Sequence, residues 1–248
     1  MERIFKRKLY ERLLEWKRVQ NGKSAILIEG ARRVGKSTLV EQFAKNEYES
    51  YILIDFNEAS DEVKSLFSNI MDKDFLFLQL QAIYNVVLKE RQSVIVFDEV
   101  QNCPLARQAI KYLVKDGRYD YIETGSLISV KKSTKDITLP SEEERVTLYP
   151  MDYEEFRWAL GDEVTVPLLR TFYEKRLPLD KAHRDKMRDF RLYMLIGGMP
   201  QAVETYLETN NFALVDHVKR GIINIYQADF QKLDPTGRLE TLFMEIPA

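Results

Sequence analysis

Residues 25–38 read AILIEGARRVGKST, and this stretch decides the fold. It carries two glycines, a lysine and a serine at the spacing G-x-x-x-x-G-K-[ST], which is typical of a nucleotide-binding P-loop. The apolar run at 25–29 predicts a buried parallel strand, and residues 38–44 predict the helix that follows the loop. A glycine-containing surface loop could match the spacing by accident, but the strand before it and the helix after it favour the P-loop.

The P-loop predicts which residues bind ATP. Its glycines let backbone N–H groups turn toward phosphate oxygens, and the N-terminus of the next helix adds positive potential beneath them. Lys36 would neutralise the β- and γ-phosphates, and the Ser37 hydroxyl would bind Mg²⁺. The predicted nucleotide-binding residues are Gly30, Ala31, Arg32, Arg33, Val34, Gly35, Lys36, Ser37 and Thr38.

A second stretch, SVIVFDE at 93–99, predicts a buried strand whose last residues are acidic. Apolar residues followed by two acids form the Walker B pattern, in which Asp98 would hold Mg²⁺ and Glu99 would act as a general base toward water. An apolar run that ends in two acids is common by itself. Its position downstream of a P-loop, with helical segments between the two, favours the catalytic interpretation.

Polar residues also follow two other predicted strands. Residues 119–126 indicate a strand and then a turn, where Thr124 or Ser126 would sense the γ-phosphate. Simple turn chemistry is the alternative explanation for the end of this segment. Asp55 and Asn57 come at the end of an earlier strand, where open α/β sheets place ligand-facing groups, although surface solvation is the simpler account of both.

Composition limits the classes of protein. The chain has 248 residues, of which 45% are hydrophobic and 31% are charged, so it can build a sizeable core. The net charge of −2 gives no global bias toward nucleic acid or membrane. The single cysteine, Cys103, excludes an internal disulfide, and the two histidines have no zinc-ligand spacing. The N-terminus lacks the apolar region of a signal peptide, and no run is long enough to cross a membrane, so we expect a soluble cytoplasmic protein.

The first twenty residues predict an amphipathic helix, because Phe5, Leu9, Leu13 and Trp16 recur on one face. The simpler interpretation is a helix that packs on the core and has a solvated basic face. A contact with nucleic acid or a partner protein is the alternative. The basic residues are Arg3, Lys6, Arg7, Lys8, Arg12, Lys17 and Arg18.

The strand pattern stops near residue 150, which predicts one domain at 1–150 and a second, helical one at 151–248. Within the first domain we expect helices at 60–71, 74–90 and 104–117, the second of them largely buried, then a polar loop at 129–145 and a last strand at 145–149. Asp152 and Glu155 form a D-x-x-E capping box, which opens the second domain. Its further helices are predicted at 168–175, 181–195, 200–209 and 212–229.

These motifs together resemble a family of bacterial and archaeal AAA-like P-loop ATPases. The resemblance rests on GARRVGKST at 30–38, VIVFDEVQ at 94–101, IETGS at 122–126, LYPMDYEEF at 148–156 and IGGMP at 196–200. It implies an α/β fold of the AAA+/RecA-like P-loop NTPase class, with a five-stranded parallel sheet flanked by helices and a smaller helical lid or winged-helix-like domain after it. In this fold the Walker B strand is not adjacent to the P-loop strand. Relatives usually carry a further C-terminal domain of unknown function. This sequence departs from them, because it stops about where that domain would begin, and we expect the domain to be absent here.

Three functions remain open from the sequence. The first is an Mg²⁺-dependent ATPase that couples hydrolysis to a conformational change, in which a neighbouring subunit supplies an arginine finger; Arg145 is the first candidate and Arg118 the second, and a surface arginine is the alternative for each. The second is a slow nucleotide-dependent binding switch. The third is a DNA-associated ATPase module, for which the basic N-terminal helix and residues 181–191 are the motivation. The predicted partners are ATP and ADP, a second copy of the chain in a homo-oligomer, and a protein or DNA.

Overall fold

The structure, a computed structural model, describes residues 3–126 and 142–246 of the chain. It divides into two compact units. One unit spans Arg7–Tyr149, and the other joins the residues before Arg7 to those after Tyr149. The division into domains at 1–150 and 151–248 stays a prediction, and the first residues of the chain group with the second unit.

The first unit is built on a five-stranded parallel sheet, which confirms the predicted fold class. The strands lie in the order β2-β3-β4-β1-β5, so β4 separates the P-loop strand β1 from the Walker B strand β3, as the resemblance implied. The strands are β1 (Ala25–Gly30), β2 (Ser50–Asp55), β3 (Ser93–Asp98), β4 (Asp120–Ser126) and β5 (Glu143–Leu148). Strands β1, β3 and β4 are buried along their whole length, which is typical of central parallel strands with covered faces.

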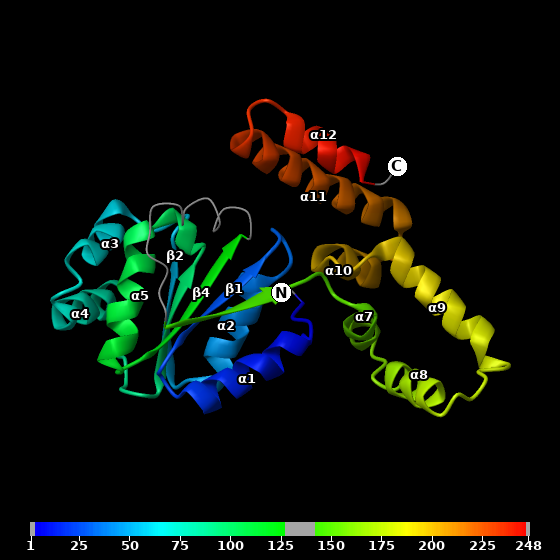
Figure 1. The fold of residues 1–248 in the computed structure, drawn as a ribbon, viewed down its shortest axis with the longest axis horizontal. Coiled ribbons are helices and arrows are strands. Elements are labelled where there is room, and N and C mark those ends of the chain that lie inside the picture. The colour runs from blue at the N-terminus through cyan, green and yellow to red at the C-terminus, as the bar shows by residue number, and fades with distance from the viewer. Residues whose placement is uncertain (1–2, 127–141, 247–248) are drawn as a thin grey trace. The chain divides into compact units, whose positions relative to one another are not determined.

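Helices cover both faces of this sheet (Figure 1). One face packs against α1 (Lys8–Gln20) and α2 (Lys36–Glu47) in a core that includes Leu13, Trp16 and Phe43. The other face packs against α3 (Asp61–Ser65), a 3₁₀ turn at Leu66–Asn69, α4 (Lys73–Tyr84) and α5 (Pro104–Asp116). A second 3₁₀ turn, Val100–Asn102, follows the Walker B strand.

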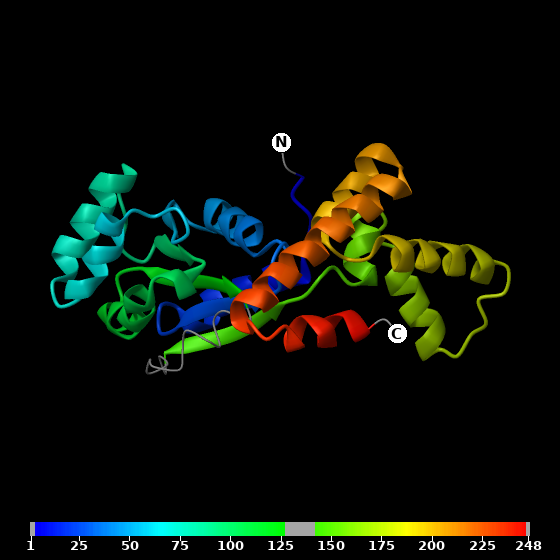
Figure 2. The ribbon, with the colours of Figure 1, turned by 90° about the horizontal axis from the view of Figure 1, so that it is seen from above.

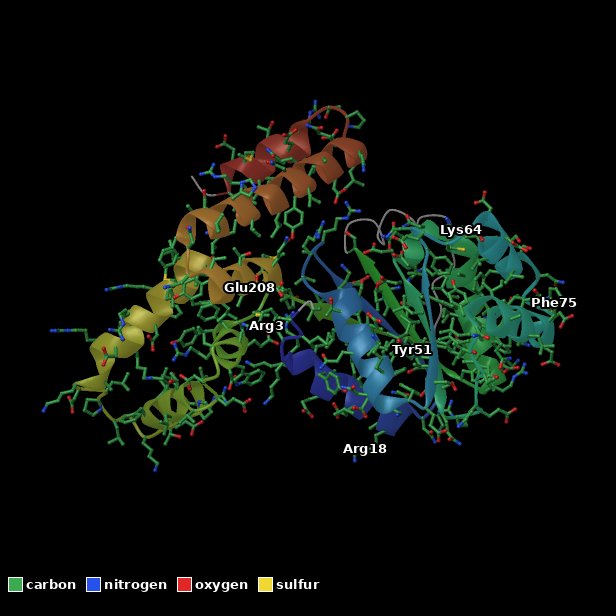
Figure 3. The ribbon with its side chains drawn as sticks, turned by 180° about the vertical axis from the view of Figure 1, so that it is seen from behind. Arg3, Arg18, Tyr51, Lys64, Phe75 and Glu208 are labelled. Carbon is green, nitrogen blue, oxygen red and sulfur yellow. The ribbon has the colours of Figure 1, made fainter. Side chains whose placement is uncertain are left out.

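Three local predictions for this unit were wrong. The N-terminal helix begins at Lys8 because Arg7 is extended (φ −126°, ψ 139°), so Phe5 lies outside the helix and packs in the core of the second unit. Ser126 belongs to strand β4 and to no turn, since the β1–β4 ladder continues to the end of both strands. Helix α4 is only half buried: Phe75, on its outer side in Figure 3, is 53% exposed. The loop predicted at 129–145 lies mostly outside the described residues.

The second unit is helical. Its helices are α7 (Tyr153–Ala159), α8 (Thr165–Glu174), α9 (Ala182–Ile196), α10 (Pro200–Thr209), α11 (Phe212–Leu233) and α12 (Arg238–Glu245). The predicted capping box of Asp152 and Glu155 is confirmed at the start of α7. The sequence did not predict α12, which packs beside α11 (Figure 2). The rings of Phe243 and Phe230 lie with their centroids 5.1 Å apart and their planes tilted by 50°.

The motifs LYPMDYEEF (148–156) and IGGMP (196–200) contact each other through Met151 and Gly198, inside this helical unit. The N–H of Met151 donates to the carbonyl of Gly198 at 2.7 Å, and the Tyr193 hydroxyl donates to the carbonyl of Met151 at 2.8 Å. A Cβ atom on Gly198 would lie only 2.1 Å from the Met151 carbonyl oxygen. The close approach of these two backbone segments therefore requires glycine at position 198.

We expect Gly198→Ala to lower the free energy of unfolding of the helical unit by about 1–3 kcal/mol, because the methyl group forces apart two hydrogen-bonded backbone segments. Urea denaturation followed by circular dichroism measures the change. Gly221→Ala is the matched control, since Gly221 is an exposed residue of α11 with no atom within 4 Å of the added methyl group. The control should be neutral or more stable by up to about 1 kcal/mol. Equal destabilisation by both variants would refute the close-packing argument.

Candidate functional site

The P-loop has the backbone conformation that phosphate binding needs. It connects the end of β1 to the start of α2, and both Arg33 (φ 64°) and Gly35 (φ 93°) adopt left-handed conformations within it. A Cβ atom on Gly30 would lie 2.5 Å from the carbonyl oxygen of Leu148, so only glycine fits where β1 ends beside β5. The left-handed residues Arg33 and Gly35 turn successive backbone N–H groups to one side of the loop, and these groups form an anion nest.

Lys36 is the buried cation of this loop, with only 5% of its side chain exposed. Its ammonium group donates to the carbonyls of Gly30 at 3.2 Å and Ala31 at 3.1 Å. Burial lowers the pKa of Lys36, while the carboxylates of Glu99 and Asp98 act in the opposite direction. The cation therefore lies across the loop and is held by neutral groups, which a phosphate could replace.

Asp98 joins the P-loop to the Walker B strand. Its Oδ1 accepts a hydrogen bond from the Ser37 hydroxyl at 3.0 Å and another from the Thr124 hydroxyl. The side chain is 5% exposed, and burial raises the pKa of this carboxyl, although the two hydroxyl donors lower it. The predicted metal ligands Ser37 and Asp98 are thus brought into contact.

Glu99 follows directly in a left-handed conformation (φ 52°). Its N–H donates to the Thr124 hydroxyl oxygen at 3.1 Å, so Thr124 contacts both acidic residues. The Gln101 amide donates to the Glu99 carboxylate. We did not predict a role for Gln101 from the sequence; the only signal was its place in the VIVFDEVQ motif.

The other polar candidates lie along the same edge of the sheet. Ser126 is paired in register with Gly30 and is buried. Its role as a sensor of the γ-phosphate stays a prediction. Asp55 is the register partner of Asp98. Its carboxylate accepts the N–H of Asn57 at 2.8 Å, so these two residues extend the polar edge from β3 to β2.

Neither predicted arginine finger belongs to this edge of its own sheet. Arg145 lies opposite Leu27 in the register of edge strand β5, and its guanidinium pairs with Glu143 at 2.8 Å. Arg118 lies at the amino end of β4, where hydrogen bonds to Asp116 raise its pKa. Asp74 also binds the Arg118 guanidinium, at 2.6 Å. The carboxylates that hold Arg118 make it a poor finger, whereas Arg145 is 40% exposed and its role stays a prediction.

Two of the four basic residues of α1 form contacts within the first unit. Arg12 pairs with Glu15 and with Glu144. Lys17 donates to a backbone carbonyl and lies 3.9 Å from the centroid of the Tyr48 ring. Arg18 projects outward from α1 in Figure 3. These contacts weaken the prediction that α1 binds nucleic acid.

A hollow of about 730 Å³ lies at the opposite, amino end of the strands. Its charged residues partly neutralise one another, since the Arg91 guanidinium lies 2.9 Å from the buried Asp120 carboxylate. Its lining residues are Glu11, Leu14, Glu15, Lys17, Arg18, Asn21, Arg91 and Asp120. The hollow is therefore separate from the P-loop edge and adds nothing to the candidate site.

The donor set at the P-loop edge fits Mg²⁺ bound together with a nucleotide. Across residues 3–126 and 142–246, no three His, Cys, Asp or Glu side chains gather to hold a metal by themselves. Mg²⁺ does not need such a cage, because it takes one or two protein oxygens, substrate phosphates and water.

Within residues 3–126 and 142–246, no helix is long and apolar enough to cross a membrane.

Comparison with solved structures finds several similar chains, one of which, with a TM-score above 0.5, shares the fold. A Walker-type ATPase of Pyrococcus abyssi is 20% identical, with a TM-score of 0.51 over 98% of this chain and 77% of that one. A signal transduction ATPase with numerous domains from Pyrococcus horikoshii is 15% identical, with a TM-score of 0.47 over 91% of this chain and 33% of that one. PCH-2 of C. elegans is 12% identical, with a TM-score of 0.45 over 84% of this chain and 65% of that one. No curated protein matches the chain.

Family profiles cover both units. Residues 187–246 match a profile described only as a domain of unknown function. Residues 22–157, more than half of the chain, match the profile of an AAA domain, and this match includes the P-loop, the Walker B strand and Thr124. The sheet order and the contacts at the P-loop edge agree with it. The chain therefore belongs to the AAA domain family.

Proposed function

We propose that the chain binds ATP with Mg²⁺ at the carboxyl edge of its sheet and hydrolyses it. The observation that carries this proposal is the hydrogen bond from the Ser37 hydroxyl to Asp98 Oδ1 at 3.0 Å. It brings together the P-loop hydroxyl and the Walker B carboxylate, the two oxygen ligands that Mg²⁺ takes from P-loop proteins. When bound, Mg²⁺ would neutralise charge on the phosphate oxygens.

The residues of the chain then have separate tasks. Lys36 exchanges its two carbonyl partners for phosphate oxygens, and the P-loop N–H groups surround the same phosphates. Glu99 orients a water molecule and accepts its proton as the γ-phosphoryl group is attacked. Thr124 contacts Asp98 and the Glu99 backbone, so it links the metal ligand to the base.

A nucleotide-dependent switch with slow turnover is the second candidate. The hydrogen bond from the Gln101 amide to the Glu99 carboxylate favours it, because that bond occupies an oxygen of the general base. ATP would then order a conformation long before it is hydrolysed. A homo-oligomer with Arg145 as arginine finger, and a protein or DNA partner, remain further proposals without a described contact to support them.

Nucleotide binding should stabilise the fold. At about 100 times its dissociation constant, Mg²⁺-ATP is expected to add about 2.7 kcal/mol to the free energy of unfolding, a melting shift of about 5–10 °C. Lys36→Ala should lose most of the shift. Lys45→Ala should keep it, because Lys45 lies on the same helix and pairs on the surface with Glu41. A melting curve of the wild type that does not respond to millimolar Mg²⁺-ATP would exclude the proposed function.

Glu99→Gln should separate binding from hydrolysis. The amide keeps the size and polarity of the side chain but cannot accept the proton, so turnover should fall by about 10²–10⁴-fold while ATP affinity is retained. Phosphate release measures turnover, and Glu58→Gln, an exposed change in the loop after β2, is the control. Equal turnover in Glu99→Gln and the wild type would remove Glu99 from the mechanism. Faster turnover in Gln101→Ala would support the switch.

Asp98→Asn should remove a pH dependence that the Asp98 carboxyl gives to the stability of the wild type. Burial raises the pKa of Asp98 in the fold, so its protonated form stabilises the fold fully below the ordinary pKa of 3.8, and this stability is lost as the pH rises through the folded-state value. Without Mg²⁺ and nucleotide, Asp98→Asn should therefore melt above the wild type at neutral pH, and the difference should close toward pH 3.8.

Mg²⁺-ATP should reverse that order, because an asparagine amide is a poorer Mg²⁺ ligand than a carboxylate. Asp55→Asn, the neighbour in register, is the control for a general loss of negative charge. Melting temperatures of Asp98→Asn that run parallel to the wild type at all pH values would show that burial of Asp98 is not costly.

A further inference from the structure

Arg7 is a buried guanidinium outside the site described above. The sequence placed it on a solvated basic face, but its side chain is 5% exposed. Burial of a charged side chain is unfavourable unless strong hydrogen bonds compensate for the lost water. Its position therefore calls for an explanation from its contacts.

The Arg7 guanidinium bridges two backbone carbonyls. Nη1 donates to the carbonyl of Val34 at 2.9 Å, and Nη2 donates to the carbonyl of Tyr149 at 2.5 Å. Val34 lies inside the P-loop, and Tyr149 directly follows strand β5. The planar guanidinium presents its two donors in a rigid fork, so one charged group holds both carbonyls in a fixed geometry.

The contact with Val34 fixes a peptide of the anion nest. In a trans peptide the C=O and the following N–H point in opposite directions. Because Arg7 holds the carbonyl of Val34, the N–H of Gly35 must point to the side away from Arg7. Gly35 has φ 93° and no side chain, so nothing else in its own structure resists a flip of this peptide. A flipped peptide would place a carbonyl oxygen among the phosphate-binding N–H groups.

The contact with Tyr149 connects the same group to the points where the chain leaves the first unit. The chain passes between the two units once at Lys6–Arg7 and once at Tyr149–Pro150. Arg7 is itself the first residue of the unit, and its side chain binds the last one. One guanidinium thus joins the P-loop to both crossings.

We propose that Arg7 is a positioning residue of the nucleotide site, which holds the Val34–Gly35 peptide ready for phosphate and ties it to both chain crossings. The proposal rests on the proposed function, because it concerns the phosphate-binding side of the P-loop. Arg7 acts through the backbone, and its guanidinium does not touch the nucleotide. A nucleotide bound at the P-loop would then also restrain the backbone on either side of the two crossings.

The first test measures the affinity for a fluorescent ADP analogue with Mg²⁺. Arg7→Met should raise the dissociation constant by about 10- to 100-fold, because a hydrogen bond from a charged group is lost at the P-loop. Arg7→Lys should raise it by about 3- to 10-fold, since an ammonium can keep one of the two carbonyl contacts. Arg12→Met is the matched control, because Arg12 lies on the same stretch and forms only surface ion pairs. Each variant is compared at a temperature where circular dichroism shows that it is folded, and Arg7→Lys carries the test if Arg7→Met does not fold.

The second test uses hydrogen exchange. If Arg7 had a purely structural role, its replacement would not selectively remove the protection that ADP gives to the two crossings. In the wild type, ADP should slow amide exchange in the P-loop and also around residues 4–8 and 147–152. In the Arg7 variants, ADP at saturation should still protect the P-loop but no longer protect the two crossings.

The outcomes separate this inference from the proposed function. If the wild type does not bind ADP, both are overturned. If the wild type binds ADP but the Arg7 variants bind as tightly as Arg12→Met, the positioning role alone is overturned. If the crossings stay protected by ADP in Arg7→Lys and Arg7→Met, the link from the P-loop to the crossings is overturned.

Discussion

The candidate site depends on one carboxylate oxygen, Asp98 Oδ1, which accepts hydrogen bonds from Ser37 and Thr124. These three residues come from the ends of β3, α2 and β4, and parallel strands bring those ends to one edge of the sheet. The position of β4 between β1 and β3 is essential, because it places the Thr124 hydroxyl within reach of Asp98. If the register of β4 were shifted by one residue, Glu123 would take that place and the polar contact would be lost.

Glu123 shows why that register is well defined. It is fully buried on the other face of β4, where its carboxylate lies 2.9 Å from the Arg107 guanidinium of α5. Arg107 also pairs with Glu143 at the start of β5, so one buried cation joins the two strands that flank β1. Burial raises the pKa of Glu123 even beside Arg107. Buried pairs of this kind are weak sources of stability but penalise any arrangement that leaves one member alone.

The sequence predicted those parts of the structure that depend on local patterns. The P-loop spacing, the acidic strand end and the apolar runs identified β1, α2 and β3. The resemblance supplied the number of strands and the separation of β1 from β3. The capping box at Asp152 was readable because both of its partners lie within one helical turn. In the candidate site, the sequence predicted that Ser37 and Asp98 share one Mg²⁺, and the structure brings the two side chains into contact.

Contacts between distant residues were not predictable in this way. Arg7 looked like a surface residue because its neighbours are basic, and only the fold brings the carbonyls of Val34 and Tyr149 to it. Helix α4 looked buried because it is apolar, yet Phe75, Leu78 and Ile83 are exposed. Composition reports the chemistry of a side chain, whereas burial depends on which elements the topology places beside it.

The two central charges of the site are not paired with each other. Lys36 is held by the carbonyls of Gly30 and Ala31, and Asp98 is held by two hydroxyl groups. Burial opposes the charged form of both, as the lowered pKa of Lys36 and the raised pKa of Asp98 show. A direct ion pair would relieve part of this cost, but it would also turn the cation away from an incoming phosphate. The fold keeps the two charges apart on neutral partners, and a ligand that carries negative phosphate and a divalent cation can satisfy both at once.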